Sequence, residues 1–171
     1  MRDTRGARVL ARSMIECIKY RVEWVTALQV FLQELDRAGE THFFSPHSAD
    51  EKTLHDLATR PTANVHCLLV EEQRVLGYGL LRGWDEGFEI PSLGIAIHPQ
   101  CRSEGLGNFL MGYLEFLAAR RGAASVRLRV FRQNAAAIAL YSARGYEWAA
   151  DPGNEDLLVG DKPLRDGVAD V

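Results

Sequence analysis

Apolar residues recur along the chain with two spacings, one typical of helices and one typical of strands. Residues 24–35 follow helical spacing, and residues 106–117 form a second apolar stripe that ends before Gly122, a residue suited to a helix C-terminus. Residues 126–130 instead alternate between apolar residues and arginine, as in a strand with one buried face. The chain therefore contains both helices and strands.

The predicted elements combine hairpins with crossovers. Strands are predicted at residues 14–22, 65–70, 75–81, 90–98, 126–131, 146–149 and 157–159, and helices at residues 24–35, 49–59, 106–117 and 135–143. Hairpins pair strands antiparallel, whereas crossovers allow parallel neighbours. The order therefore predicts a mixed sheet covered by helices, which is an α/β (α+β) fold.

The composition fits one folded domain. The chain has 171 residues, of which 47% are hydrophobic and 25% charged. We expect a single domain over residues 13–165, a flexible arginine-rich segment at residues 1–12 and a tail at residues 166–171. Three widely spaced cysteines predict neither a disulfide framework nor a zinc cage. Cys101 lies beside the glycine-rich stretch, where it could be exposed enough to react, but no catalytic role is predicted for it.

The charge narrows the classes of partner. A formal net charge of -3 provides no basic field for nucleic acid or for an acidic membrane, so neither is expected as a partner. Arg127, Arg129 and Arg132 are interpreted as polar positions on and after one strand. No apolar run is long enough to span a bilayer or to form a signal peptide, which predicts a cytoplasmic protein.

The stretch with the clearest chemistry follows the strand at residues 90–98. It runs from Pro99 through Arg102, Gly105 and Gly107 into a helix. Backbone N–H groups at a helix N-terminus have no partner within the helix, and the helix dipole adds a partial positive charge there. Glycines let this backbone come close to a ligand. The stretch therefore predicts a site for a pyrophosphate.

Two familiar nucleotide motifs are absent from this stretch. A P-loop needs lysine and serine or threonine after its last glycine, where this chain has Asn108 and Phe109. A Rossmann turn needs a third glycine, where this chain has Leu110. ATP and NAD are therefore disfavoured. The alternative is that the two glycines only shape a tight turn.

A second motif follows the strand at residues 126–131. It reads N-A-A-A-I-A-L-Y-S-A-R-G-Y from Asn134 to Tyr146. The first motif, R-x-x-G-x-G, follows a strand, and one helix and one strand separate it from the second motif. Together, in this order, the two motifs resemble the GCN5-related N-acetyltransferase (GNAT) superfamily. The resemblance covers residues 90–146.

The resemblance implies a single-domain, mostly antiparallel central sheet with helices on both faces, and acetyl-CoA as co-substrate without a metal. By resemblance, the cofactor-binding residues are Ile95, Ala96, Ile97, Arg102, Ser103, Glu104, Gly105, Leu106, Gly107, Asn108, Asn134, Ala137 and Tyr141. Tyr141 matches the position of a general acid for the leaving thiolate. The chain departs from the common pattern at Ser103, where glycine is frequent, and at Asn108, where a basic residue is frequent. The second departure concerns an auxiliary contact to the CoA phosphates.

The acceptor side is predicted from the chemistry of amine acetylation. The amine must arrive unprotonated, the oxyanion must be stabilised, and the thiolate benefits from a proton. A free backbone N–H near Ile97 can serve the oxyanion. The loop at residues 84–89 carries carboxylates that can pair with an ammonium acceptor, and Glu89 is the preferred base. The alternative for Asp85 and Glu86 is a solvated loop.

Aromatic and histidine residues complete the expected acceptor pocket. The candidate substrate-binding residues are Phe43, His47, Trp84, Asp85 and Glu86. The pair His42 and His47 lacks a third partner and is not expected to bind a metal. His98 is either close to the acyl site or only a cap at the sheet edge. Tyr113 and Phe116 are interpreted as core residues.

These observations predict an N-acetyltransferase that transfers the acetyl group of acetyl-CoA to the primary amine of a small polar metabolite, an amino sugar or an amino acid-like compound. Transfer is expected by direct attack in a ternary complex. The alternatives are a non-catalytic acyl-CoA sensor, an acetyltransferase that acts on a protein amine, and a nucleotide-binding domain. The sequence leaves the oligomeric state undetermined, and the resemblance adds a homodimer to the alternatives.

Overall fold

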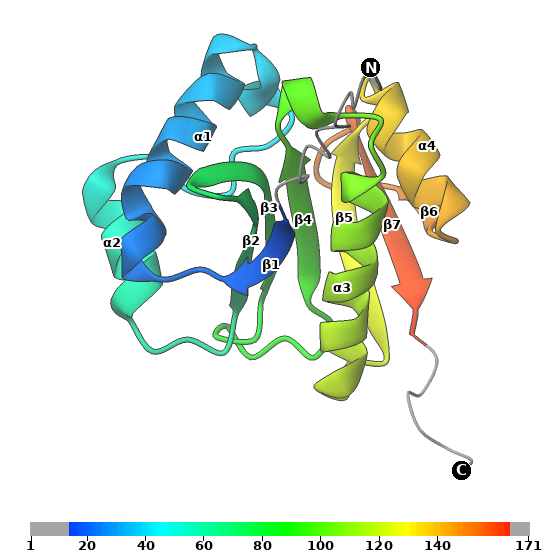
Figure 1. Ribbon diagram of the computed structural model, residues 1–171. Coiled ribbons are helices and arrows are strands. Elements are labelled where there is room, and N and C mark those ends of the chain that lie inside the picture. Colours follow the sequence, from blue (N-terminus) through cyan, green and yellow to red (C-terminus); the bar gives the residue numbers. More distant parts are fainter. Residues whose placement is uncertain (1–13, 165–171) are drawn as a thin grey trace, which may run out of the picture.

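In the computed structural model, residues 14–164 are described, and they form a seven-stranded sheet between layers of helices (Figure 1). The strands are β1 (Ile15–Lys19), β2 (Val65–Glu71), β3 (Arg74–Arg82), β4 (Ser92–Ile97), β5 (Ser125–Phe131), β6 (Glu147–Ala150) and β7 (Leu157–Pro163). The helices are α1 (Val25–Arg37), α2 (Glu51–Thr59), α3 (Leu106–Arg120) and α4 (Ala135–Ala143). The predicted segment 1–12 and tail 166–171 lie outside the described residues.

The sheet is mixed and mostly antiparallel, as predicted. The strand order is β1-β2-β3-β4-β5-β7-β6, and the pair β4 and β5 in its middle is parallel. This pair has a single bridge, between Ser92 and Arg127. Every other neighbouring pair is antiparallel and extends over at least four residues. The sheet is therefore open between the later residues of β4 and β5.

Helices cover both faces because the buried strands are apolar on both sides. On β2, Leu68 and Val70 belong to one core together with α1 and α2 residues, whereas Cys67 and Leu69 belong to a second core with residues of α3. Successive side chains of a strand point to opposite faces, so this alternation needs a helical layer on each side. The prediction of helices on both faces is confirmed (Figure 1).

Two sequence-based placements were wrong. Phe116 is 60% exposed, because it lies about 200° around the helix from the buried Leu114. Cys101 is buried, since the 3-10 turn Pro99–Cys101 folds its side chain into the core. The first predicted strand also ends early, at Lys19, and a 3-10 turn follows it at Val22–Trp24. No helix in residues 14–164 is long and apolar enough to cross a bilayer.

Candidate active site

The opening between β4 and β5 exposes backbone groups of the central strand. The His98 N–H, just beyond β4, donates to the Leu76 carbonyl on the β3 side, at 2.8 Å. Because backbone groups alternate in direction along a strand, the N–H and C=O groups of Ile95 and Ile97 point the other way, toward β5. The bridge to β5 has ended at Ser92, so these groups face the opening.

The N-terminus of α3 adds further unpaired donors beside this opening. Gly105 precedes the helix with φ +83°, and no side chain caps the helix. The Phe109 N–H donates to the Gly105 carbonyl at 3.0 Å and starts the helical hydrogen-bond series. The N–H groups of Leu106, Gly107 and Asn108 precede that bond and have no carbonyl within the helix. Together with the helix dipole they favour an anion.

Arg102, Ser103 and Asn108 shape the backbone around the N-terminus of α3. Arg102 donates from Nη1 to the Glu40 carboxylate at 2.9 Å, which ties the loop to the segment after α1. Ser103 has φ +65°, a conformation that glycine adopts more easily. The Asn108 Oδ1 accepts a 2.6 Å hydrogen bond from Arg144 of the α4 C-terminus. The departures at Ser103 and Asn108 therefore both have local structural consequences.

A cavity of about 480 Å³ joins these parts. Its lining contains every implied cofactor-binding residue except Glu104. Glu40 and Leu140 also contribute, which sequence reasoning did not predict. Glu40 carried no sequence signal, because its place depends on the chain returning from α1 to the loop at Arg102.

Helix α4 closes the cavity with Asn134 and Tyr141. The Asn134 Oδ1 accepts from the Ala137 N–H at 3.1 Å and so caps the helix, which leaves its amide N–H₂ as the polar group for a ligand. Tyr141 is 8% exposed and lines the cavity. Burial raises the pKa of Tyr141 to about 12, so its hydroxyl stays protonated near neutral pH. This hydroxyl forms no hydrogen bond with another described residue.

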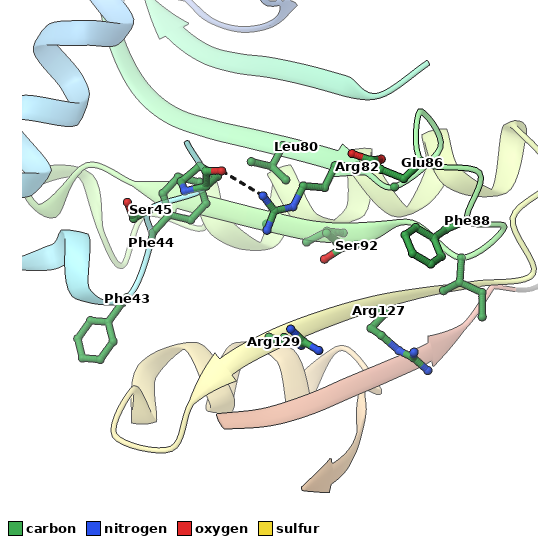
Figure 2. Close-up of a pocket in the computed structure, with 15 residues that line it drawn as sticks. Phe43, Phe44, Ser45, Leu80, Arg82, Glu86, Phe88, Ser92, Arg127 and Arg129 are labelled. Carbon is green, nitrogen blue, oxygen red and sulfur yellow. Dashed lines mark hydrogen bonds between the residues drawn. The ribbon is translucent and has the colours of Figure 1, made fainter. Parts of the chain in front are cut away.

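A second cavity, of about 590 Å³ (Figure 2), shares part of its lining with the first. The residues that line both cavities are Phe43, Phe44, Leu93, Gly94 and Arg129. Gly94 lies between them: a Cβ there would come within 3.3 Å of both the Leu80 and the Phe44 side chains. The absence of a side chain at Gly94 therefore keeps the junction open.

A family model described as the acetyltransferase (GNAT) family matches residues 29–146. This chain belongs to the GNAT acetyltransferase family. The match extends well before the two motifs and includes α1 from residue 29 onward and the segment that carries Phe43 and Phe44.

Solved structures share the GNAT fold at low identity. The PaiA N-acetyltransferase of Thermoplasma acidophilum, in complex with coenzyme A, is 16% identical with a TM-score of 0.74 and covers 88% of this chain and 99% of its own. The ribosomal-protein-S18-alanine N-acetyltransferase of Escherichia coli is 20% identical with a TM-score of 0.68, over 92% and 99% of the two chains. The yncA protein of Salmonella typhimurium, with its cofactor acetyl-CoA, is 19% identical with a TM-score of 0.73, over 93% and 99%.

The structure brings only part of the expected GNAT acceptor site together. Phe43 and Glu86 line the second cavity. Asp85 lies outside both cavity linings and accepts hydrogen bonds from Thr62 Oγ1 and the Ala63 N–H, and the bond from Thr62 lowers the pKa of Asp85.

Trp84 and Glu89 also lie outside both cavity linings. The Trp84 ring lies 4.8 Å beneath the guanidinium of Arg121 and packs against the core. Glu89 is exposed and directly precedes Ile90, a residue of the second cavity lining. Of the loop at residues 84–89, the cavity wall therefore contains Glu86 and Phe88.

Residues that sequence reasoning missed face the second cavity instead. Arg82, Arg127 and Arg129 all line it. The alternation at residues 126–130 correctly placed Arg127 and Arg129 on one face of a strand. The cavity on that face depends on the separation of β4 from β5, which the alternation does not encode.

His98 supports the site from outside it. Its Nδ1 accepts from Arg74 at 3.2 Å and from the Gln100 N–H at 3.3 Å, so its Nε2 carries the proton. That Nε2 lies 3.0 Å from the Glu34 carboxylate on α1. His98 is buried and thus joins α1 to the end of β4, which agrees with a structural role.

His47, a candidate substrate-binding residue, lies outside both cavity linings and belongs to a series of hydrogen bonds with Tyr78 and His66. Its Nδ1 lies 2.8 Å from the Ser48 carbonyl, which can only accept, so Nδ1 carries the proton and Nε2 is an acceptor. The Tyr78 hydroxyl, 2.8 Å away, therefore donates to this Nε2. His66 Nδ1 then donates to the Tyr78 oxygen at 2.7 Å. With both histidines neutral, the Tyr78 hydroxyl both donates and accepts a hydrogen bond.

Acid is expected to break this chain of hydrogen bonds. Burial lowers the pKa of His47 and lowers that of His66 to about 4, below the ordinary value of 6.5. The unfolded protein therefore binds more protons, and the free energy of unfolding falls as the pH drops from about 6.5 toward 4 and is unaffected by these groups above that range. At about 1.4 kcal/mol per pKa unit, the shift of His66 alone lowers the free energy of unfolding by roughly 3 kcal/mol between pH 6.5 and pH 4.

Urea unfolding at several pH values tests this prediction. The variant His66→Asn should lose less stability between pH 6.5 and 4 than the wild type. The control His55→Asn, at an exposed position on α2, should keep the wild-type pH dependence. Equal slopes for wild type and His66→Asn would contradict the assignment.

Proposed function

We propose that this acetyltransferase transfers the acetyl group of acetyl-CoA to the primary amine of a small polar metabolite, by direct attack in a ternary complex. The observation that carries the proposal is the convergence of the β4 opening, the α3 N-terminus and Tyr141 in one cavity, with a second cavity joined to it. Two similar structures, the PaiA N-acetyltransferase with coenzyme A and the yncA protein with acetyl-CoA, support the choice of donor.

The residues present suit acetyl-CoA. The N–H groups of Leu106, Gly107 and Asn108 would hold the pyrophosphate, and the backbone groups of Ile95 and Ile97 would pair with the pantetheine amides. When bound, acetyl-CoA supplies an activated thioester. No lysine or arginine is needed to hold the pyrophosphate, because a helix N-terminus provides both donors and a favourable dipole.

Two groups of the chain would act during transfer. With acetyl-CoA bound, the β4 backbone N–H groups that face the opening would stabilise developing negative charge on the acyl oxygen. The Tyr141 hydroxyl, which stays protonated and has no hydrogen bond to another described residue, would give its proton to the departing sulfur. Glu89 remains our proposed base, and it would act through water because it lies outside both cavity linings.

The acceptor is proposed to be a small molecule because the second cavity is of ligand size. Its volume of about 590 Å³ lies within the range of about 300–1,000 Å³ that is typical of small-molecule sites. Aromatic walls from Phe43, Phe44 and Phe88 suit a ligand with an apolar part.

Binding and turnover with acetyl-CoA test the proposed function. Acetyl-CoA at about 100 times its Kd should add roughly 2.7 kcal/mol to the free energy of unfolding and raise the Tm, whereas ATP and NAD should not. Thiol release from acetyl-CoA should then depend on an added amine. Equal shifts with ATP, or no shift with acetyl-CoA, would overturn the donor assignment. Binding without amine-dependent thiol release would instead indicate a sensor.

A further inference from the structure

Three arginines converge on the second cavity from two strands. Arg82 comes from the end of β3, and Arg127 and Arg129 come from β5. Figure 2 shows Arg82 reaching toward the segment that carries Phe44 and Ser45, with Arg127 and Arg129 along β5 on the opposite side. The described lining contains one acidic residue, Glu86.

The three arginines differ in how far their charges are neutralised. Arg127 forms a two-point ion pair with Asp161 through Nε and Nη2, at 2.7 and 3.0 Å, and Arg129 lies 2.8 Å from Asp151. Arg82 donates from Nη1 to the Pro46 carbonyl at 3.1 Å. It forms no ion pair with any residue between 14 and 164. Arg82 therefore has both charge and N–H groups available to a ligand.

The positive charge of these arginines is confined to the second cavity, because the whole chain has a net charge of -3. Guanidinium groups donate in a planar fork that matches carboxylate and phosphate oxygens. They also repel a second ammonium group, which disfavours a polyamine. The lining thus selects for an anion at the arginine end and leaves the amine to extend toward Gly94 and the first cavity.

We infer that the acceptor is an amine that also carries an anionic group, a carboxylate or a phosphate, which Arg82 binds. The inference rests on the proposed function and specifies its substrate class. Arg127 and Arg129 line the same cavity, but Asp161 and Asp151 already pair with their charges, so Arg82 is the group that binds the anion. Phe88 and Phe44 contact the apolar part between the two polar ends. An amino acid-like acceptor meets this description, whereas a neutral amino sugar does not.

Pairs of amines that differ only in an anionic group measure the effect of that group on binding. The pairs are leucine with leucinamide and O-phosphoethanolamine with ethanolamine, and putrescine represents a polyamine. Each is titrated calorimetrically into the CoA-loaded protein, and turnover of acetyl-CoA is measured separately. The Kd of the anionic member of at least one pair should be at least about tenfold lower than the Kd of its neutral partner, since one hydrogen bond to a charged group typically lowers a Kd by about that factor. The leucine and phosphoethanolamine arms distinguish carboxylate from phosphate.

Variants at Arg82 locate the effect. Arg82→Gln should remove the preference within a pair while the Kd of acetyl-CoA stays unchanged, and Arg82→Lys should keep part of it. Arg60→Gln, at an exposed arginine outside both cavity linings, should behave as the wild type. No binding of any anionic probe, a preference for putrescine, or a preference that survives Arg82→Gln overturns the inference. Anion binding without acetyl transfer overturns only the proposed function.

Discussion

Tyr141→Phe is expected to lower kcat by about 10² to 10⁴, the usual range for a positioned general acid, while the Kd of acetyl-CoA stays near that of the wild type. The hydroxyl is needed only when the C–S bond breaks, and the ring, which packs against Tyr146 and Trp148, is retained in the variant. Calorimetric binding and steady-state rates on the same preparation measure both quantities.

A control and a second acyl donor strengthen this test. Tyr113→Phe removes the hydroxyl of a partly buried tyrosine on α3 outside both cavity linings, and it should leave kcat unchanged. An acyl donor with a more acidic thiol should recover part of the rate lost in Tyr141→Phe, because a better leaving group needs the proton less. Full activity of Tyr141→Phe would show that the residue only packs.

Gly107→Val is expected to weaken acetyl-CoA binding by about 10- to 100-fold while the protein stays folded. A Cβ at Gly107 would lie 3.2 Å from Leu140 and within 4 Å of Ile95 and Ile97, all of which line the first cavity. The added side chain would therefore occupy space in that cavity that the ligand needs, and a 10- to 100-fold weaker Kd corresponds to about 1.4 to 2.7 kcal/mol of binding free energy. Replacing a helical glycine also raises helix propensity, so the loss should appear in binding rather than in folding.

The neighbouring turn provides the control for Gly107→Val. Phe109 is 54% exposed and lies outside both cavity linings, so Phe109→Val places the same side chain two residues later without entering either cavity. It should bind acetyl-CoA as the wild type does. Gly107→Ala should give an intermediate Kd. Wild-type binding by Gly107→Val would place the donor elsewhere.

The residues proposed to bind acetyl-CoA could be predicted because they belong to short, continuous segments of the chain. Gly105 and Gly107 at the start of an apolar helical stripe indicated a helix N-terminus with free amides, which requires only that the helix forms. The run from Asn134 to Tyr146 predicted one short helix, and the structure has that helix at Ala135–Ala143, with Asn134 and Tyr141 in the lining of the first cavity.

The acceptor side could not be predicted in the same way, because its residues come from distant segments. Asp85 was a candidate for the acceptor pocket, but Thr62 and Ala63 hold it outside both cavity linings. Arg127 and Arg129 were interpreted as the polar face of a strand, but they line the cavity.

By itself, the sequence determined the order of the elements and a mixed sheet covered by helices, because helical and strand periodicity act within about a dozen residues. The family followed from the resemblance of two short motifs, which lie within residues 90–146. The tertiary structure decided which charged side chains line the second cavity. Alternation shows which side chains share a face of a strand, but the surface opposite that face depends on which strands pair and where β4 and β5 separate.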